Sequence, residues 1–328
     1  MSLTVLSRRH WLHALALLTL PSHKALAQPV WPSRPVRLIV PYPSGGVSDQ
    51  VARWLAEALA PSLGQPVMVE NKPGASGTLG MDALAKSLPD GHTLALSAIS
   101  PLTLHPHLGK TPYDPVQDIT PIASVMSSPV LLLATPACQA RDWAELLQLA
   151  RQQPGAIRWS TSGSASLGHL MLEHVRLQTG VNFTHVPYKG GGQQITDALA
   201  GHVEILSVNA GPAVMAHLKQ GRLRALAVGA PARLDSLPLV PTLEQAGLPI
   251  ANLSSVFGLF APARTPVGVV SKLNQEVNRV LQQADFKRRL QQADIVPTGG
   301  SSVTFVHHIT QESQHNARVI QAARIQPD

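Results

Sequence analysis

The fold is decided by the stretch Val36-Arg37-Leu38-Ile39-Val40-Pro41-Tyr42-Pro43-Ser44-Gly45-Gly46-Val47-Ser48-Asp49. It begins with a β-branched apolar run and continues into a loop of small residues. From Gln50 to about Leu63, apolar residues then return at intervals of three and four, which is the spacing of one helix face. Gly64 stands where a helix C-cap is expected. The stretch therefore predicts a strand, a small-residue loop and an amphipathic helix.

The same order recurs twice. Residues 156–159 and 183–186 read as strands, residues 160–166 and 187–192 as small-residue loops, and residues 167–179 and 193–200 as helices. Further strands are predicted at 66–70, 93–96, 223–228 and 257–260, and further helices at 143–152, 267–283 and 303–323. This alternation predicts an α/β fold with largely parallel sheets.

Length and composition narrow the class of protein. A chain of 328 residues exceeds what one compact core usually covers, so two lobes are expected. Charged residues make up 14% and hydrophobic residues 44%, which excludes intrinsic disorder, and no dense basic tract suggests a nucleic-acid partner. The single cysteine, Cys138, excludes an internal disulfide and a multi-cysteine metal site.

The first 27 residues have the pattern of a secretory signal peptide. Arg8 and Arg9 precede a short apolar run at 14–20, and Ala25-Leu26-Ala27 forms a small-x-small cleavage site before Gln28. We expect cleavage near Ala27 and Gln28 and an extracytoplasmic location for the mature protein. The arginine pair also suits a twin-arginine signal, so both the general and the twin-arginine export routes stay open.

The three small-residue loops are candidate anion sites. In open α/β sheets ligands bind beyond the carboxyl ends of the strands, and helix N-termini present unpaired N–H groups to anions. The loops therefore suggest a carboxylate or phosphate held between them. The alternative is that Asp49 and Ser166 only cap their helices and that the glycines only turn the chain.

Catalytic, cofactor and metal motifs are weak. The run Ser164-Ala165-Ser166-Leu167-Gly168 is close to a nucleophile elbow but lacks its first glycine, and His169 follows on the same helix, so a serine hydrolase using Ser166 is only an alternative. No glycine-rich nucleotide motif occurs, and no cofactor is expected. The histidine groups lack the spacing of a metal site and are predicted to be solvated surface residues; they are His105 with His107, and His307 and His308 with His315.

Ordered motifs over the whole mature chain resemble the Bug/TctC family, the periplasmic solute receptors of tripartite tricarboxylate transporters. They include Trp31-Pro32-Ser33-Arg34-Pro35 leading to Gly45-Gly46, Glu70-Asn71-Lys72-Pro73-Gly74, Pro89-Asp90-Gly91, His185-Val186-Pro187-Tyr188-Lys189-Gly190 and Gly258-Leu259-Phe260-Ala261-Pro262. Three positions depart from the usual family pattern: Ser44 replaces Pro or Ala, Ala165 replaces Gly, and Val256 replaces Trp.

The resemblance implies a two-domain type II periplasmic binding protein, a Venus flytrap, with two crossover strands at the hinge. Lobe 1 is expected to comprise residues 28–129 and 257–328, and lobe 2 residues 130–256. The implied protein is a monomer and not an enzyme, which captures a small carboxylate between its lobes and delivers it to the membrane permease subunits of the transporter. A receptor that reports its ligand to an extracytoplasmic sensor domain is the alternative.

The resemblance also implies a set of ligand-binding residues on two loops, one from each lobe. They are Ser44, Gly45, Gly46, Val47 and Asp49 in lobe 1, and Thr161, Gly163, Ser166, His169, Tyr188 and Lys189 in lobe 2.

Overall fold

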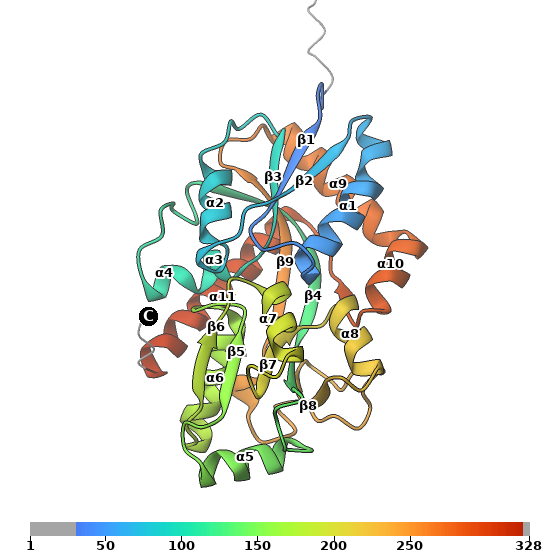
Figure 1. The fold of residues 1–328 in the computed structure, drawn as a ribbon. Coiled ribbons are helices and arrows are strands. Elements are labelled where there is room, and N and C mark those ends of the chain that lie inside the picture. Colours follow the sequence, from blue (N-terminus) through green and yellow to red (C-terminus); the bar gives the residue numbers. More distant parts are fainter. Residues whose placement is uncertain (1–30, 324–328) are drawn as a thin grey trace, which may run out of the picture.

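The computed structural model describes residues 31–323, so the predicted signal peptide lies outside the described residues. Two α/β lobes lie one above the other and share two long strands (Figure 1). Within residues 31–323 no helix combines the length and the apolar character needed to cross a membrane.

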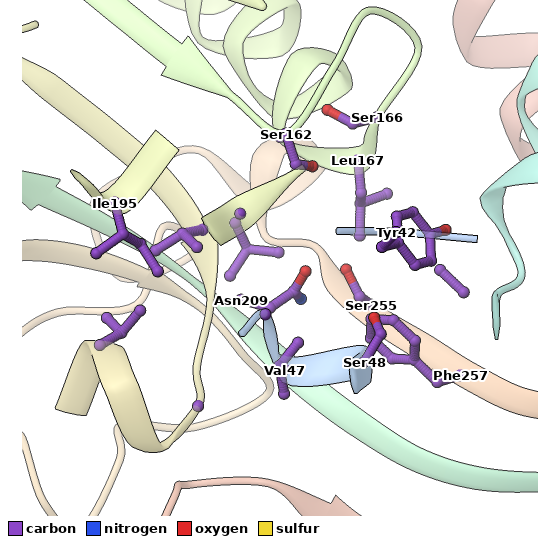
Figure 2. A pocket seen from close by; sticks show the side chains of 18 of the residues that line it. Tyr42, Val47, Ser48, Ser162, Ser166, Leu167, Ile195, Asn209, Ser255 and Phe257 are labelled. Atoms are coloured by element: carbon purple, nitrogen blue, oxygen red, sulfur yellow. The ribbon is translucent and has the colours of Figure 1, made fainter. Parts of the chain in front are cut away.

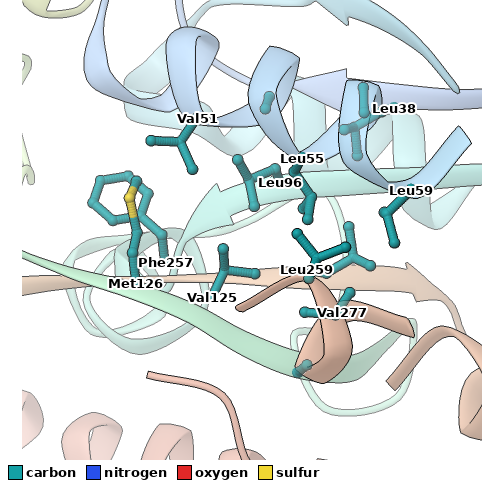
Figure 3. Packing of buried hydrophobic residues seen from close by; sticks show 14 of the residues in the cluster. Leu38, Val51, Leu55, Leu59, Leu96, Val125, Met126, Phe257, Leu259 and Val277 are labelled. Carbon is teal, nitrogen blue, oxygen red and sulfur yellow. The ribbon is translucent and has the colours of Figure 1, made fainter. Parts of the chain in front are cut away.

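The first lobe is built on five strands in the order β2-β1-β3-β9-β4. They are β1 (Val36–Val40), β2 (Val67–Asn71), β3 (Thr93–Ala98), β4 (Ile119–Ala134) and β9 (Ser254–Pro262), and the short β10 (Val296–Pro297) pairs with β4. One face of this sheet packs against α1 (Val47–Leu63), α9 (Val267–Gln282) and α10 (Ala284–Gln291), and the resulting core includes Leu38, Leu55, Leu259 and Val277 (Figure 3). The other face packs against α2 (Thr78–Ala85), α3 (Ser100–Thr103) and α11 (Ser302–Ala323). The loop before α2 carries the short helix η2 (Ala75–Gly77).

The second lobe repeats the layered plan. Its strands are β5 (Arg158–Thr161), β6 (Thr184–Pro187), β7 (Ile205–Asn209) and β8 (Arg224–Gly229), together with the end of β4 from Val130 to Ala134. One face packs against α5 (Trp143–Gln152) and α6 (Leu167–Thr179), and the other against α7 (Gly191–Leu199) and α8 (Pro212–Lys219). The short helix η3 (Pro249–Ala251) precedes β9.

Strands β4 and β9 connect the lobes. They pair antiparallel from Ile119 with Pro262 to Pro129 with Ser254, and from Val130 onward β4 pairs with β7 and β8 instead. The strands that carry the small-residue loops are parallel, as predicted, but the two connecting strands make each sheet mixed. The two crossover strands expected of this fold are therefore present.

A second apolar contact joins the lobes at one side. Leu104 and Leu108, the latter in the short helix α4 (His105–Leu108), pack with Leu170 of α6 and Ile320 of α11. In Figure 1, α11 runs from the first lobe down beside α6.

Two helices begin inside the loops from which they were expected to emerge. Helix α1 begins at Val47 and not at Gln50, and α7 begins at Gly191 and not at Gln193. The reason is that Gly46 has an extended backbone (φ −76°, ψ 170°) and is the N-cap of α1, while Gly190 (φ 147°) is the N-cap of α7. The small residues thus form the first turns of these two helices. The backbone N–H groups of a first turn have no acceptor within the helix.

Candidate functional site

The candidate site is a cavity between the two lobes. Its walls are the first turns of α1, α6, α7 and α8, completed by β4, β7 and β9 (Figure 2). Its volume is about 870 Å³, counted together with the part that opens to solvent. One helix N-terminus from the first lobe and three from the second therefore meet around one space.

The N-terminus of α1 is held in place by Asp49. Its carboxylate, which is 4% exposed, accepts hydrogen bonds from the backbone N–H of Gly45 at 3.0 Å, from Arg53 at 2.9 Å and from Nδ2 of Asn71 at 3.0 Å. Burial alone would raise the pKa of Asp49, but the hydrogen bonds from Arg53, Gly45 and Asn71 bring it below its usual value. The alternative interpretation of the sequence, that Asp49 caps α1, is therefore wrong. Asp49 instead stabilises the loop that precedes α1 by hydrogen bonding.

Several hydroxyl groups face the cavity. Within the described chain, the hydroxyls of Ser48, Ser162 and Ser255 form no hydrogen bond, although Ser48 is 5% and Ser255 7% exposed. Burial raises the pKa of Tyr42 to about 12, with bonds to Ser97 and Ser100 acting in the opposite direction. Tyr42 thus stays a neutral phenol at any physiological pH, and the serine hydroxyls are available to a ligand.

The loop before α6 is stabilised from within. Ser166 is the N-cap of α6, and its hydroxyl accepts from the backbone N–H of His169 at 3.3 Å. The His169 ring stacks on that of His185 with 4.1 Å between centroids, and its Nδ1 accepts from the backbone N–H of Ala165 at 3.2 Å. Thr161 Oγ1 lies 2.8 Å from Nε2 of His185. Thr161 and His169 therefore shape this loop.

The lobes touch each other across the mouth of the cavity. The Ser76 hydroxyl of the first lobe donates to the carbonyl of Ser164 in the second at 2.5 Å. A Cβ on Gly163 (φ 148°) would lie 2.2 Å from Oγ of Ser76, and a Cβ on Gly192 would lie 2.9 Å from the carbonyl oxygen of Ser44. Since real side chains do not approach so closely, the structure is a closed form that depends on glycine at these contacts.

The described side chains that line the cavity carry no charge. None of the described residues that line it is Asp, Glu, Lys, Arg or His. Residues 31–323 also contain no group of three acidic, histidine or cysteine residues that would hold a metal ion. Favourable potential for an anion therefore comes from the N–H groups and dipoles of the helix N-termini.

The structure separates the eleven predicted ligand-binding residues into three groups. Four line the cavity: Gly45, Gly46, Val47 and Ser166. Four line an outer groove between the lobes, beside Ser76 and His105: Gly163, His169, Tyr188 and Lys189. Three line neither space: Ser44, Asp49 and Thr161.

Several lining residues were missed by sequence reasoning. Tyr42, Ser48 and Ser162 lie within the loops that the sequence identified. The sequence could therefore place these residues near the site, but it could not show that their side chains point into the cavity. Ser255 in β9 and Ile195 in α7 carry no motif, and only the tertiary structure brings them to the cavity.

One prediction about histidine is wrong. His105 is not a solvated surface residue, because its Nε2 is buried without a hydrogen-bond partner among residues 31–323. Burial lowers the pKa of His105 to about 4. The ring is therefore neutral at pH 7. His105 is the first residue of α4 and lines the outer groove.

Known proteins match this chain closely. Residues 51–325 match the TctC model, described as the tripartite tricarboxylate transporter family receptor. Protein BugT of Bordetella pertussis is 37% identical over 257 residues, which are 77% of this chain and 78% of BugT. A protein from R. palustris solved with adipate is 33% identical, with a TM-score of 0.87 over 91% of this chain and 100% of that one. The periplasmic binding protein BugD is 28% identical, with a TM-score of 0.86 over 91% of this chain and 100% of BugD.

A further solved structure extends the likeness. MatC from Rhodopseudomonas palustris with bound malate is 31% identical, with a TM-score of 0.83 over 88% of this chain and 100% of MatC. The family model, the two-lobed α/β fold and the interlobe cavity agree with one another, and the resemblance found in the sequence motifs is confirmed. This chain belongs to the TctC family of tripartite tricarboxylate transporter receptors, which includes the Bug proteins.

Proposed function

We propose that this protein is a periplasmic receptor that binds a small carboxylate between its lobes and delivers it to the membrane permease subunits of a tripartite transporter. The observation that carries the proposal is the neutral interlobe cavity, in which helix N-termini and free serine hydroxyls converge. Neutral donors suit a carboxylate, because they bind the anion and leave no buried countercharge when it departs.

The relatives support a carboxylate as the ligand class. One solved neighbour at 33% identity holds adipate, and another at 31% identity holds malate. In this chain the carboxylate would accept from the first N–H groups of α1, at Val47 and Ser48, and from hydroxyls such as Ser255. Among the predicted residues that do not line the cavity, Asp49 and Thr161 would act as positioning residues, and Lys189 would act from the outer groove.

Binding would be completed by closure. Residues 28–129 with 257–328 would move as one body and residues 130–256 as the other, about the crossover strands β4 and β9. Contacts such as the bond from Ser76 to the carbonyl of Ser164 exist only when the lobes meet. A ligand that bridges the lobes adds contacts in the closed form alone, and so shifts the population toward it.

The serine hydrolase alternative has little support from the geometry. The Ser166 hydroxyl accepts from the backbone N–H of His169, while Nδ1 of the His169 ring accepts from Ala165 and its Nε2 faces Glu173 at 3.6 Å. The imidazole therefore makes no contact with Oγ of Ser166 that a general base would need.

Two experiments test the proposal. Isothermal titration of the purified mature protein with adipate, malate and short monocarboxylates should give saturable binding, and small-angle scattering should show a more compact particle with ligand. A folded protein that binds none of these acids at millimolar concentration would contradict a carboxylate receptor. Uptake of the bound acid by proteoliposomes that contain the permease subunits tests delivery; ligand-dependent binding to a sensor domain without uptake would favour the sensory alternative.

A further inference from the structure

The interlobe cavity has one polar and one apolar end. In Figure 2, Tyr42, Ser48 and Ser255 lie together at the polar end, with Leu167 and Phe257 beside them. Ile195 lies across the cavity from them, at the apolar end. This division bears on which carboxylates the site can hold.

The polar end has the donors for one anionic group. The residues Ser48 and Ser255 are 5% and 7% exposed, and their hydroxyls have no hydrogen-bond partner among the described residues. Ser48 also stands in the first turn of α1, whose N–H groups are unpaired within the helix. Both hydroxyls are therefore free to donate a hydrogen bond to a ligand atom in the cavity.

The apolar end consists of branched aliphatic side chains. Ile195 of α7, Val208 of β7 and Val214 of α8 belong to one buried cluster of the second lobe and are 7%, 7% and 2% exposed. Helix α8 begins with Pro212, which has no N–H to offer an anion.

The N-terminus of α7, at the same end, is in close contact with the first lobe. A Cβ on Gly190 would lie 2.4 Å from Pro43, and a Cβ on Gly192 2.9 Å from the carbonyl oxygen of Ser44. Pro212 thus removes one N–H donor from the first turn of α8, and the first lobe packs closely on the first turn of α7, whose Gly191 still lines the cavity.

We infer that the preferred ligand of this protein is a monocarboxylate with an apolar body, with Ile195 and Val214 as specificity-determining residues. The inference rests on the proposed carboxylate-receptor function. The carboxylate lies at the serine end, and the hydrocarbon part packs on the branched side chains. A second carboxylate at the far end of the ligand would lose its hydration against side chains that offer no charge and few donors.

The test compares acids that differ at one end only. Hexanoate and adipate have the same chain length, but adipate carries a second carboxylate. Titration should show hexanoate binding at least about 30-fold more tightly than adipate, because the second carboxylate is left without partners. Affinity should also rise about fourfold per methylene from butanoate to hexanoate. Adipate binding as tightly as hexanoate, or affinity independent of chain length, would overturn the inference while leaving a carboxylate receptor; binding of no acid would refute the receptor itself.

A pair of variants locates the apolar end. Val214→Thr introduces a hydroxyl of nearly the same shape and should weaken hexanoate at least about fivefold, while acetate, which reaches only the serine end, keeps its affinity. The matched control is Val116→Thr, at a side chain that is 78% exposed. If Val214→Thr binds hexanoate as the wild type does, Val214 does not contact the ligand. Should Val214→Thr not fold, the comparison of hexanoate with adipate on the wild type decides the inference.

Discussion

Replacement of Gly192 by alanine should have opposite effects on two properties: it should stabilise the second lobe and disfavour closure of the two lobes. Gly192 is the second residue of α7, and a Cβ there would lie 2.9 Å from the carbonyl oxygen of Ser44 in the other lobe. Alanine favours the helix over glycine by roughly 0.5–1 kcal/mol. The closed form, in contrast, has to accommodate an overpacked contact that costs about 1–3 kcal/mol.

The two effects predict opposite changes. The ligand-free Gly192→Ala protein should unfold about 1–3 °C higher than the wild type, if it is free to open. Its affinity for the carboxylate should be lower by about 5- to 150-fold, because only the closed form bears the contact with Ser44.

Gly268→Ala is the matched control. Gly268 is also the second residue of its helix, α9, and a Cβ there would meet no atom within 4 Å. This variant should gain the same stability and keep its affinity for the ligand. Differential scanning calorimetry gives the melting temperatures and isothermal titration the affinities. If Gly192→Ala binds as tightly as Gly268→Ala, Ser44 and Gly192 are not in contact in the ligand-bound protein, and the closure geometry described above is refuted.

Three further predictions concern buried polar groups. Asp49→Asn should lower the free energy of unfolding by about 1–3 kcal/mol and weaken ligand binding. Because folding lowers the pKa of Asp49, the difference in free energy of unfolding between wild type and variant, measured by urea titration, should shrink below about pH 4. Burial, aided by the charge of His315, lowers the pKa of His174 to about 4 from 6.5. The neutral His174 ring therefore makes its full contribution to the free energy of unfolding above pH 6.5. Up to about 3 kcal/mol of that free energy should be lost as the pH falls toward 4. His174→Leu should flatten this profile in urea titrations, and an unchanged profile would exclude His174 as its cause. Ser166→Ala should lose about 1 kcal/mol with its N-cap, and neither it nor the wild type should cleave an activated ester; wild-type turnover abolished in the variant would restore the hydrolase alternative.

Much of the architecture follows from local sequence. The alternation of apolar strands, small-residue loops and amphipathic helices is encoded residue by residue, because the side-chain period of a strand differs from that of a helix. Helix α5 has the bounds that its pattern predicts, 143–152. The starts of α1 and α7 were misplaced, because small residues read equally well as a loop or as a first helical turn.

The candidate site could be predicted from the sequence only in part. The loops could be located because glycines and small polar residues cluster there. Their side-chain directions could not, since the periodicity of a sequence reports burial and not the identity of the neighbour. Thr161 and Ser162 are adjacent in the chain, yet Thr161 bonds within its own lobe and Ser162 faces the cavity.

The sequence by itself determined the α/β class and the family, since both depend on patterns that are continuous along the chain. Only the tertiary structure decided which residues form the cavity. Ser48 and Ser255 are more than two hundred positions apart in the printed sequence, and Ile195 belongs to a different lobe from Ser48. These side chains line one cavity because β4 and β9 run between the two lobes and bring them together, and a contact between lobes leaves no trace in the local pattern of either one.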